Sequence, residues 1–165
     1  MNELYKEYDV PQDLQFKTAD IIRMGGLICS AGLSTKYFAD VFSAPNKITK
    51  ATVELSFSVA DKEILVRGRV FGTREVQCAR CLKMSAQEFS EEFIETYSTK
   101  TEIIDIISLV QQTLALTEEI RFLCKPDCKG LCPVCGHNLN EGDCGCDRFV
   151  PDPRMAALQQ LLNKK

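Results

Sequence analysis

The stretch ATVELSFSVADKEILVRGRVF, residues 51–71, decides the fold. Its first half places an apolar residue at every second position from Val53 to Val59. This alternation predicts a strand with one buried face and one solvated face. The dipeptide Asp61-Lys62 then predicts a turn, after which residues 64–71 return as an antiparallel partner strand. We expect Gly68 to mark a β-bulge in this second strand.

The pattern continues on both sides of this hairpin. Residues 89–97 alternate Phe and Tyr with Glu and predict a third strand, and residues 13–17 predict a short one. Residues 105–117 predict a helix with Asp105 as its N-cap, because Ile106, Leu109, Val110 and Leu114 form one apolar stripe. Asp152-Pro153 predicts the start of a short C-terminal helix.

These elements predict an α+β fold, in which one helix packs on an antiparallel sheet that covers about residues 10–100. A cysteine-rich zinc module and the short C-terminal helix follow. The expected domains are therefore 1–123, the sheet with its helix, and 124–165, the module with the terminal helix.

Composition excludes some classes of protein. The chain has 165 residues, of which 45% are hydrophobic and 26% charged, as in a globular protein rather than a disordered one. Its 20 basic and 23 acidic residues give a net charge of −3, so it does not coat nucleic acid by bulk charge. A local basic patch remains compatible with this total.

The nine cysteines are the most informative feature of the composition. The N-terminal residues lack the basic and apolar regions of a signal peptide, and charges interrupt every long apolar run, so we expect a cytoplasmic protein without a membrane segment. In a reducing cytoplasm, closely spaced cysteines ligate metals more often than they form disulfides. Disulfides remain the alternative if the compartment is oxidising.

The cysteine spacing predicts two zinc sites. Cys132 and Cys135 form a CPVC knuckle in which Gly136 supplies a positive φ, and Cys144 and Cys146 complete a distal site. We expect the remaining pairs to make a proximal site of Cys78, Cys81, Cys124 and Cys128, provided that the turn between the strands lies beside residue 124. The pairing itself cannot be deduced from spacing, and iron–sulfur centres also accept four thiolates.

Two further residues have side chains that can bind metal. Cys29 lies in an apolar context and is predicted to be a small core residue. The single histidine, His137, follows the knuckle directly and is a reserve ligand for the distal site.

Two catalytic readings of the cysteines compete with the zinc sites. Cys128, Cys132 and Cys135 have the CxxxCxxC spacing of radical SAM enzymes, but such enzymes need a longer βαβ chain. Cys78 and Cys81 have the spacing of a thioredoxin-like motif, but such a motif opens a helix, and here it lies between two strands.

Basic residues near the cysteines form a candidate contact surface for RNA phosphates or for an acidic protein. The alternative is an ordinary solvated face that offsets the negative charge of the thiolates. The candidate contact residues are Arg67, Arg69, Arg80, Lys83 and Lys129.

Three segments in this order also resemble a known family: VQCARCL at 76–82, CKGLCPVCGHNLN at 128–140 and DPRMAAL at 152–158. The chain resembles the YceD family, the large ribosomal RNA subunit accumulation proteins, over about residues 50–162. The resemblance implies a small bacterial cytoplasmic protein that supports accumulation of large-subunit ribosomal RNA, and it implies no catalytic activity.

Taken with the cysteines, the resemblance predicts a non-enzymatic zinc-binding factor with about two Zn²⁺ per chain. It would act in ribosome assembly by binding ribosomal RNA or a ribosomal protein, with no membrane or small-molecule substrate. The alternative is a thiol redox sensor, in which loss of zinc frees thiolates that form disulfides.

Overall fold

The computed structural model describes residues 10–117 and 121–148. The chain forms two compact units, of which the first comprises residues up to Gln77 together with Met84–Phe122. The second comprises Cys78–Lys83 together with the chain from Leu123 onward. The second unit thus contains the segment Cys78–Lys83, which the sequence analysis placed in the expected domain 1–123 as a turn between two strands.

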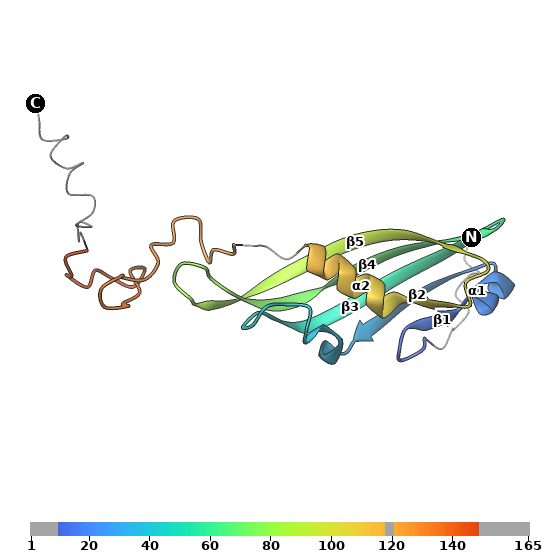
Figure 1. Cartoon of the computed structure of the whole chain (residues 1–165), viewed down its shortest axis with the longest axis horizontal. Coiled ribbons are helices and arrows are strands. Elements are labelled where there is room, and N and C mark those ends of the chain that lie inside the picture. The colour runs from blue at the N-terminus through green and yellow to red at the C-terminus, as the bar shows by residue number, and fades with distance from the viewer. Residues whose placement is uncertain (1–9, 118–120, 149–165) are drawn as a thin grey trace, which may run out of the picture. The chain divides into compact units, whose positions relative to one another are not determined.

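The first unit is built on a four-stranded antiparallel sheet, which confirms the predicted α+β class (Figure 1). Each strand pairs with its neighbour in sequence. Short connections at residues 61–62 and 78–83 join β3 to β4 and β4 to β5, whereas the longer segment 34–46 separates β2 from β3. The predicted turn at Asp61 and Lys62 joins the two central strands. In spatial order the strands are β2 (Gly26–Leu33), β3 (Lys47–Ala60), β4 (Glu63–Gln77) and β5 (Met84–Ser98).

A smaller sheet lies beside the larger one in this unit. Its strands are β1 (Gln15–Lys17) and β6 (Ile103–Asp105), which pair antiparallel although they are far apart in sequence. The helix α1 (Thr18–Met24) follows β1 directly, and a 3₁₀ turn, η1 (Thr35–Phe38), follows β2.

The helix predicted at 105–117 is α2 (Ile106–Leu116). Asp105 is its N-cap as predicted: its carboxylate accepts hydrogen bonds from the Ser108 backbone N–H at 3.3 Å and from the Ser108 hydroxyl at 2.7 Å. The buried residues of the helix fall on the expected stripe and include Val110 and Leu114. Figure 1 shows α2 lying across one face of the four-stranded sheet.

The hydrophobic core of the first unit lies between this helix and the sheet. It contains side chains from every strand of the large sheet, together with Phe16 of β1, whose ring lies 4.8 Å from that of Phe57. Residues at alternate positions face the other way, so that Arg67, Arg69 and Ile94 lie on the opposite face of the sheet. This unit therefore has a core of its own, without any contribution from the clustered cysteines.

The expected bulge at Gly68 is wrong. The β3–β4 and β4–β5 pairings run without interruption through Gly68, and the irregularity in β3 lies between Ile48 and Lys50 instead. Gly68 is opposite Phe93 on β5, and a Cβ at Gly68 would lie 2.1 Å from Cζ of that ring. The glycine is needed for close packing rather than for a bulge.

The predicted C-terminal helix from Asp152 lies outside the described residues. Among the residues that the structure describes, no helix has both the length and the apolarity required to cross a membrane.

Candidate metal centres

Eight cysteines gather into two groups of four, both within the second unit. In each group the sulfur atoms all lie within 4.8 Å of one another. The proximal tetrad is Cys78, Cys81, Cys124 and Cys128, and the distal tetrad is Cys132, Cys135, Cys144 and Cys146. These are the two groups that we expect from the sequence, although spacing alone does not fix which pairs share an ion.

The sulfur positions in the proximal tetrad suit a single ion. The sulfur atoms of Cys78 and Cys128 lie 3.8 Å apart, and those of Cys81 and Cys124 lie 3.6 Å apart. A zinc ion with Zn–S bonds of about 2.3 Å holds tetrahedral sulfur ligands about 3.8 Å from one another. All nine cysteines are free, and these separations far exceed the S–S bond of about 2.05 Å in a disulfide.

Each tetrad contains one knuckle with the same backbone hydrogen bonds. In the proximal knuckle, Leu82 N–H donates to the Cys78 carbonyl at 2.9 Å, and Cys78 N–H donates to the Lys83 carbonyl at 2.9 Å. In the distal knuckle, Gly136 N–H donates to the Cys132 carbonyl at 2.9 Å, and Cys132 N–H donates to the His137 carbonyl at 2.8 Å. The two CxxC segments are therefore two copies of one local structure.

The residue after each knuckle has a positive φ. Gly136 has φ 73°, as the sequence predicted, and Leu82 occupies the equivalent position with φ 59°. A side chain is costly in this left-handed region, by about 1–2 kcal/mol. The hydrogen bonds of the proximal knuckle therefore hold Leu82 in a conformation that leucine does not favour.

The remaining two cysteines of the proximal tetrad come from the loop 124–130. The guanidinium Nη1 of Arg80 donates a hydrogen bond to the Cys128 carbonyl at 2.9 Å, which joins the knuckle to this loop. Gly130 packs against the same residue, because a Cβ at Gly130 would lie 3.2 Å from the Arg80 carbonyl oxygen. Nδ2 of Asn140 lies 3.3 Å from the Cys128 sulfur and donates to it. Sequence reasoning missed Asn140, since nothing in the local pattern distinguishes it from a turn residue.

The two tetrads differ in exposure. In the proximal tetrad Cys78, Cys81 and Cys128 are buried, and Cys124 is half-buried. In the distal tetrad only Cys132 is buried, and Cys135 is exposed to solvent. Solvent and small oxidants therefore have easier access to the distal sulfur atoms.

Acid–base properties are uneven within the proximal tetrad. Burial raises the pKa of Cys124 to about 12, and the neighbouring thiols add to the rise. Burial also favours a high pKa at Cys78, but backbone N–H groups of Cys124, Cys81 and Arg80 outweigh it and lower the pKa to about 6. For Cys128, burial is likewise outweighed, mainly by the hydrogen bond from Asn140, and its pKa is lowered.

The distal tetrad has the same unevenness. Backbone N–H groups of Cys135 and Val134 lower the pKa of Cys132 to about 6. The neighbouring thiols of Cys135 and Cys144, together with burial, raise the pKa of Cys146 to about 12. Four thiolates cannot share so small a space without a cation among them, whereas a divalent ion allows all four to ionise. The donor set and its spacing thus fit a divalent metal ion in each tetrad.

The competing readings of the cysteines do not match this grouping. Cys128 belongs to the proximal tetrad and Cys132 and Cys135 to the distal one, so the three cysteines with radical SAM spacing do not form one cluster. The Cys78–Cys81 segment connects β4 to β5 rather than opening a helix, unlike a thioredoxin motif.

The other two candidate metal-binding side chains lie outside the tetrads. His137 is exposed, and its backbone carbonyl rather than its imidazole supports the distal knuckle. Cys29 is half-buried on the inner face of β2, packed against the core, and burial raises its pKa to about 11.

The predicted contact residues fall in two places. Arg67 and Arg69 lie on the outer face of the sheet in the first unit, whereas Arg80, Lys83 and Lys129 lie in the second unit. Arg67 precedes the end of β4 by ten residues, or about 33 Å of strand. The structure therefore does not assemble the five basic residues into one patch within either unit.

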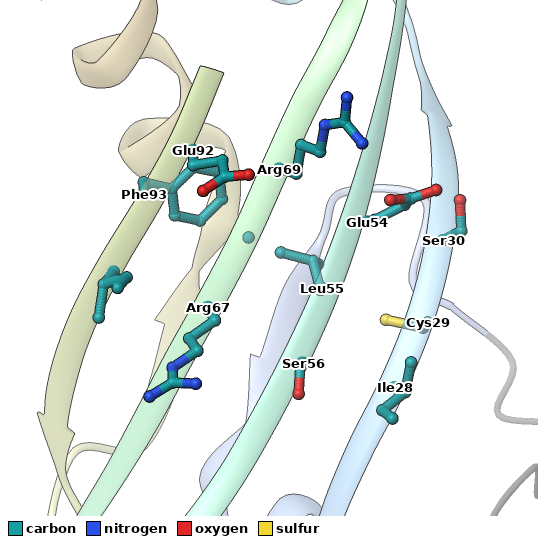
Figure 2. A pocket seen from close by; sticks show the side chains of 12 residues that line it. Ile28, Cys29, Ser30, Glu54, Leu55, Ser56, Arg67, Arg69, Glu92 and Phe93 are labelled. Carbon is teal, nitrogen blue, oxygen red and sulfur yellow. The ribbon is translucent and has the colours of Figure 1, made fainter. Parts of the chain in front are cut away.

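A groove of about 630 Å³ surrounds the two arginines of β4. Figure 2 shows the side chains that line it. Ile28 and Ile94, which are 58% and 65% exposed, line it together with Ser56. Arg69 is flanked across the strands by Glu54 and Glu92, and it donates to the Ser90 hydroxyl at 2.9 Å. The guanidinium of Arg67 forms no hydrogen bond or ion pair with any residue that the structure describes.

Comparison with known proteins gives a family match to part of the chain. A family model described as "Large ribosomal RNA subunit accumulation protein YceD" matches residues 96–162, a span that includes α2 and six of the eight clustered cysteines. This match supports assignment to the YceD family. It begins later in the chain than the resemblance noted in the sequence and does not include Cys78 or Cys81.

The similar curated proteins are of mycobacterial origin. An uncharacterized protein of Mycobacterium bovis and uncharacterized proteins of two Mycobacterium tuberculosis strains are each 28% identical over 127 residues. Each match covers 67% of this chain and 61% of the relative, so the chain spans about three fifths of the length of these relatives. No solved structure gives a significant match.

Proposed function

We propose that this chain, which its match at residues 96–162 assigns to the YceD family, is a non-enzymatic zinc-binding factor. It supports accumulation of large-subunit ribosomal RNA, or assembly of that subunit, in the bacterial cytoplasm. It does so by binding ribosomal RNA or a ribosomal protein. The family description supplies the link to large-subunit RNA, and the two cysteine tetrads supply the link to metal.

The observation that carries the proposal is the convergence of four sulfur atoms in each tetrad. Four thiolate ligands are typical of structural zinc sites, which have no open position for a substrate. An iron–sulfur cluster would place several metal atoms between its cysteines and hold their sulfur atoms further apart. The 3.6 and 3.8 Å separations in the proximal tetrad therefore favour one ion per site.

The groove on the sheet supports the binding part of the proposal. Arg67 has a guanidinium without a described partner, and Arg69 stacks over the Phe71 ring at 5.5 Å. Guanidinium groups bind phosphates, and the seryl hydroxyls beside them donate hydrogen bonds. Glu54 and Glu92 limit the positive charge of this face, so we expect moderate rather than strong binding of RNA.

The test combines metal analysis with RNA binding. Elemental analysis of purified protein is expected to give two zinc ions per chain and no labile sulfide, with no visible colour. Filter binding to large-subunit RNA at several salt concentrations is expected to show affinity that falls as salt rises. Iron with labile sulfide would refute the zinc assignment, and salt-independent or absent binding would leave a ribosomal protein as the partner.

The contact residues are tested with a matched control. Arg67→Ala and Arg69→Ala should each weaken RNA binding. Each should also reduce the slope of log affinity against log salt concentration by about 1, as the loss of one phosphate contact does. The control is Arg23→Ala, which removes an exposed arginine of α1 that pairs with Asp20 in the same helix. Equal effects of all three substitutions would place the RNA elsewhere.

A second candidate function is supported by the exposure of Cys135. A zinc-bound thiolate that solvent reaches is open to oxidation. A peroxide would oxidise two such thiolates to a disulfide, be reduced to water, and so release the zinc ion. The distal tetrad would then act as a redox-sensitive switch. Reversible release of metal by mild peroxide, together with a change in RNA binding, would favour this candidate over a purely structural role.

A further inference from the structure

Asn140 lies on the segment that connects the two halves of the distal tetrad, yet it contacts the proximal tetrad. It is located between Cys135 and Cys144 in the chain. Its side-chain nitrogen donates to the Cys128 sulfur, which is a proximal ligand candidate, at 3.3 Å. Asn140 therefore belongs to the segment between the distal cysteine pairs but forms a hydrogen bond with a cysteine of the proximal tetrad.

The orientation of the Asn140 amide is fixed by its other hydrogen bonds. Its Oδ1 accepts from the Lys129 backbone N–H at 3.0 Å, and its Nδ2 also donates to Oδ1 of Asn138 at 2.9 Å. A flipped amide would place an oxygen against the sulfur and a donor against the Lys129 N–H. The hydrogen-bond network thus directs an N–H group at Cys128.

The position of Asn140 depends on the hairpin that carries the distal knuckle. Leu131 and Asn138 form an antiparallel bridge, and Leu139 N–H donates to the Gly130 carbonyl at 2.9 Å. Cys132 N–H closes the same hairpin by donating to His137 at 2.8 Å. An ion bound between this knuckle and the pair at residues 144 and 146 would fix the chain on both sides of Asn140.

We propose that Asn140 couples the two metal sites, so that occupation of the distal tetrad strengthens metal binding at the proximal one. This rests on the proposal that both tetrads bind zinc. Hydrogen bonds to a metal-bound thiolate stabilise its charge, and removal of such a partner commonly lowers metal affinity 10–100-fold. Because coupling between binding sites is reciprocal, the proximal ion strengthens the distal site by the same factor.

The test compares zinc affinities of the two sites in the full-length chain. Zinc is titrated against a competing chelator, and the amide NMR signals of Cys78 and Cys144 report the two sites separately. Asn140→Asp keeps the oxygen that accepts from Lys129 but replaces the donor with a carboxylate that repels the thiolate. The matched control is Asn46→Asp, which introduces the same charge at a side chain that accepts from the Gln77 backbone N–H at 2.9 Å, in the other unit.

We expect Asn140→Asp to weaken proximal zinc binding at least tenfold, and Asn46→Asp to leave it unchanged. Replacing Cys144 and Cys146 by serine should weaken proximal binding to a similar extent, without any change at Asn140. In that distal-deficient chain, Asn140→Asp should have a much smaller further effect, as a double-mutant cycle requires of coupled positions.

The outcomes separate this proposal from the one on which it rests. Wild-type protein that binds no zinc at either tetrad would refute the proposed function itself. Protein that binds two zinc ions, with proximal affinity unaffected by Asn140→Asp or by loss of the distal cysteines, would overturn the coupling and leave the zinc sites intact.

Discussion

Nη1 of Arg80 lies 2.9 Å from the carbonyl oxygen of Cys128, a hydrogen bond between residues 48 positions apart. Arg80 lies inside the proximal knuckle, and Cys128 belongs to the loop that supplies the other two sulfur atoms. An arginine that the sequence offered as an RNA contact thus holds together two segments that share a candidate metal ion.

We expect Arg80→Ala to weaken zinc binding at the proximal tetrad by about tenfold, because the loss of one hydrogen bond of about 1.4 kcal/mol is a tenfold change in affinity. The measurement is competition with a chelator, read at Cys78. The control is Lys83→Ala, which removes a neighbouring positive charge but retains the carbonyl that accepts from Cys78 N–H. If both variants bind zinc normally and lose RNA binding equally, Arg80 is a contact residue after all.

A second prediction concerns packing in the sheet. Gly68→Ala would place a methyl group 2.1 Å from the Phe93 ring, and such overpacking costs about 1–3 kcal/mol. Urea unfolding followed by circular dichroism should show the loss in stability. Gly32→Ala is the control, since a Cβ at Gly32 meets nothing within 4 Å. Phe93→Leu should recover part of the loss in the Gly68→Ala chain, and failure to recover any would contradict this explanation.

The strands and the main helix could be predicted because their signals are local. Alternation from Val53 to Val59 marks β3, and Asp105 followed by an apolar stripe marks the start of α2. The error at Gly68 has a physical cause: a missing side chain is compatible with either a bulge or a close neighbour. Only the long-range pairing with Phe93 decides between them.

The candidate metal centres were predictable to a similar depth. Close pairs such as Cys132 and Cys135 can be recognised as candidate metal ligands from their spacing, which is a local property of the sequence. The supporting contacts of Arg80 and Asn140 depend on segments that meet only in the folded chain, so no local sequence pattern predicts them. The pairing of β1 with β6 was missed for the same reason.

Removal of metal should affect the two units differently. The first unit has its own hydrophobic core, whereas the described residues of the second include few buried apolar side chains besides the cysteines. We expect a chelator to move the amide NMR signals of residues 124–148 toward random-coil positions, while signals of β3 and β4 remain. An unchanged spectrum after complete zinc removal would show that the cysteines need no ion to hold this structure.

Zinc affinity should rise with pH at both sites, and more steeply at the distal one. Ligands bind zinc as thiolates, so thiols with raised pKa must release protons when the metal binds. The backbone N–H of Cys146 lowers the pKa of Cys144, but the neighbouring thiols and burial outweigh it, so the pKa of Cys144 is raised. The pKa of Cys146 is raised as well, and in the proximal tetrad that of Cys124 is raised. Competition titrations between about pH 6 and 8 give both slopes. Equal slopes at the two sites would contradict the prediction that the distal thiols release more protons when zinc binds.

Oxidation should begin at the distal tetrad. Cys135 is exposed, whereas Cys78, Cys81 and Cys128 are buried. We expect limiting hydrogen peroxide to release one zinc ion per chain first, as two distal thiolates form a disulfide and peroxide is reduced to water. Mass spectrometry after alkylation identifies the oxidised pair of cysteines. A thiol reductant with added zinc should reduce the disulfide and restore the zinc-bound tetrad. Simultaneous loss of both ions would show that burial does not protect the proximal site.

Residues 78–83 belong to the second unit although β4 and β5, on either side of them, belong to the first. The cysteine-rich part is therefore not a detachable tail. A protein shortened to end before residue 123 would keep two of the proximal sulfur atoms, in Cys78 and Cys81, and lose their partners. Conversely, after a protease cut between residues 118 and 122, an ion bound by the proximal tetrad would still join the two fragments.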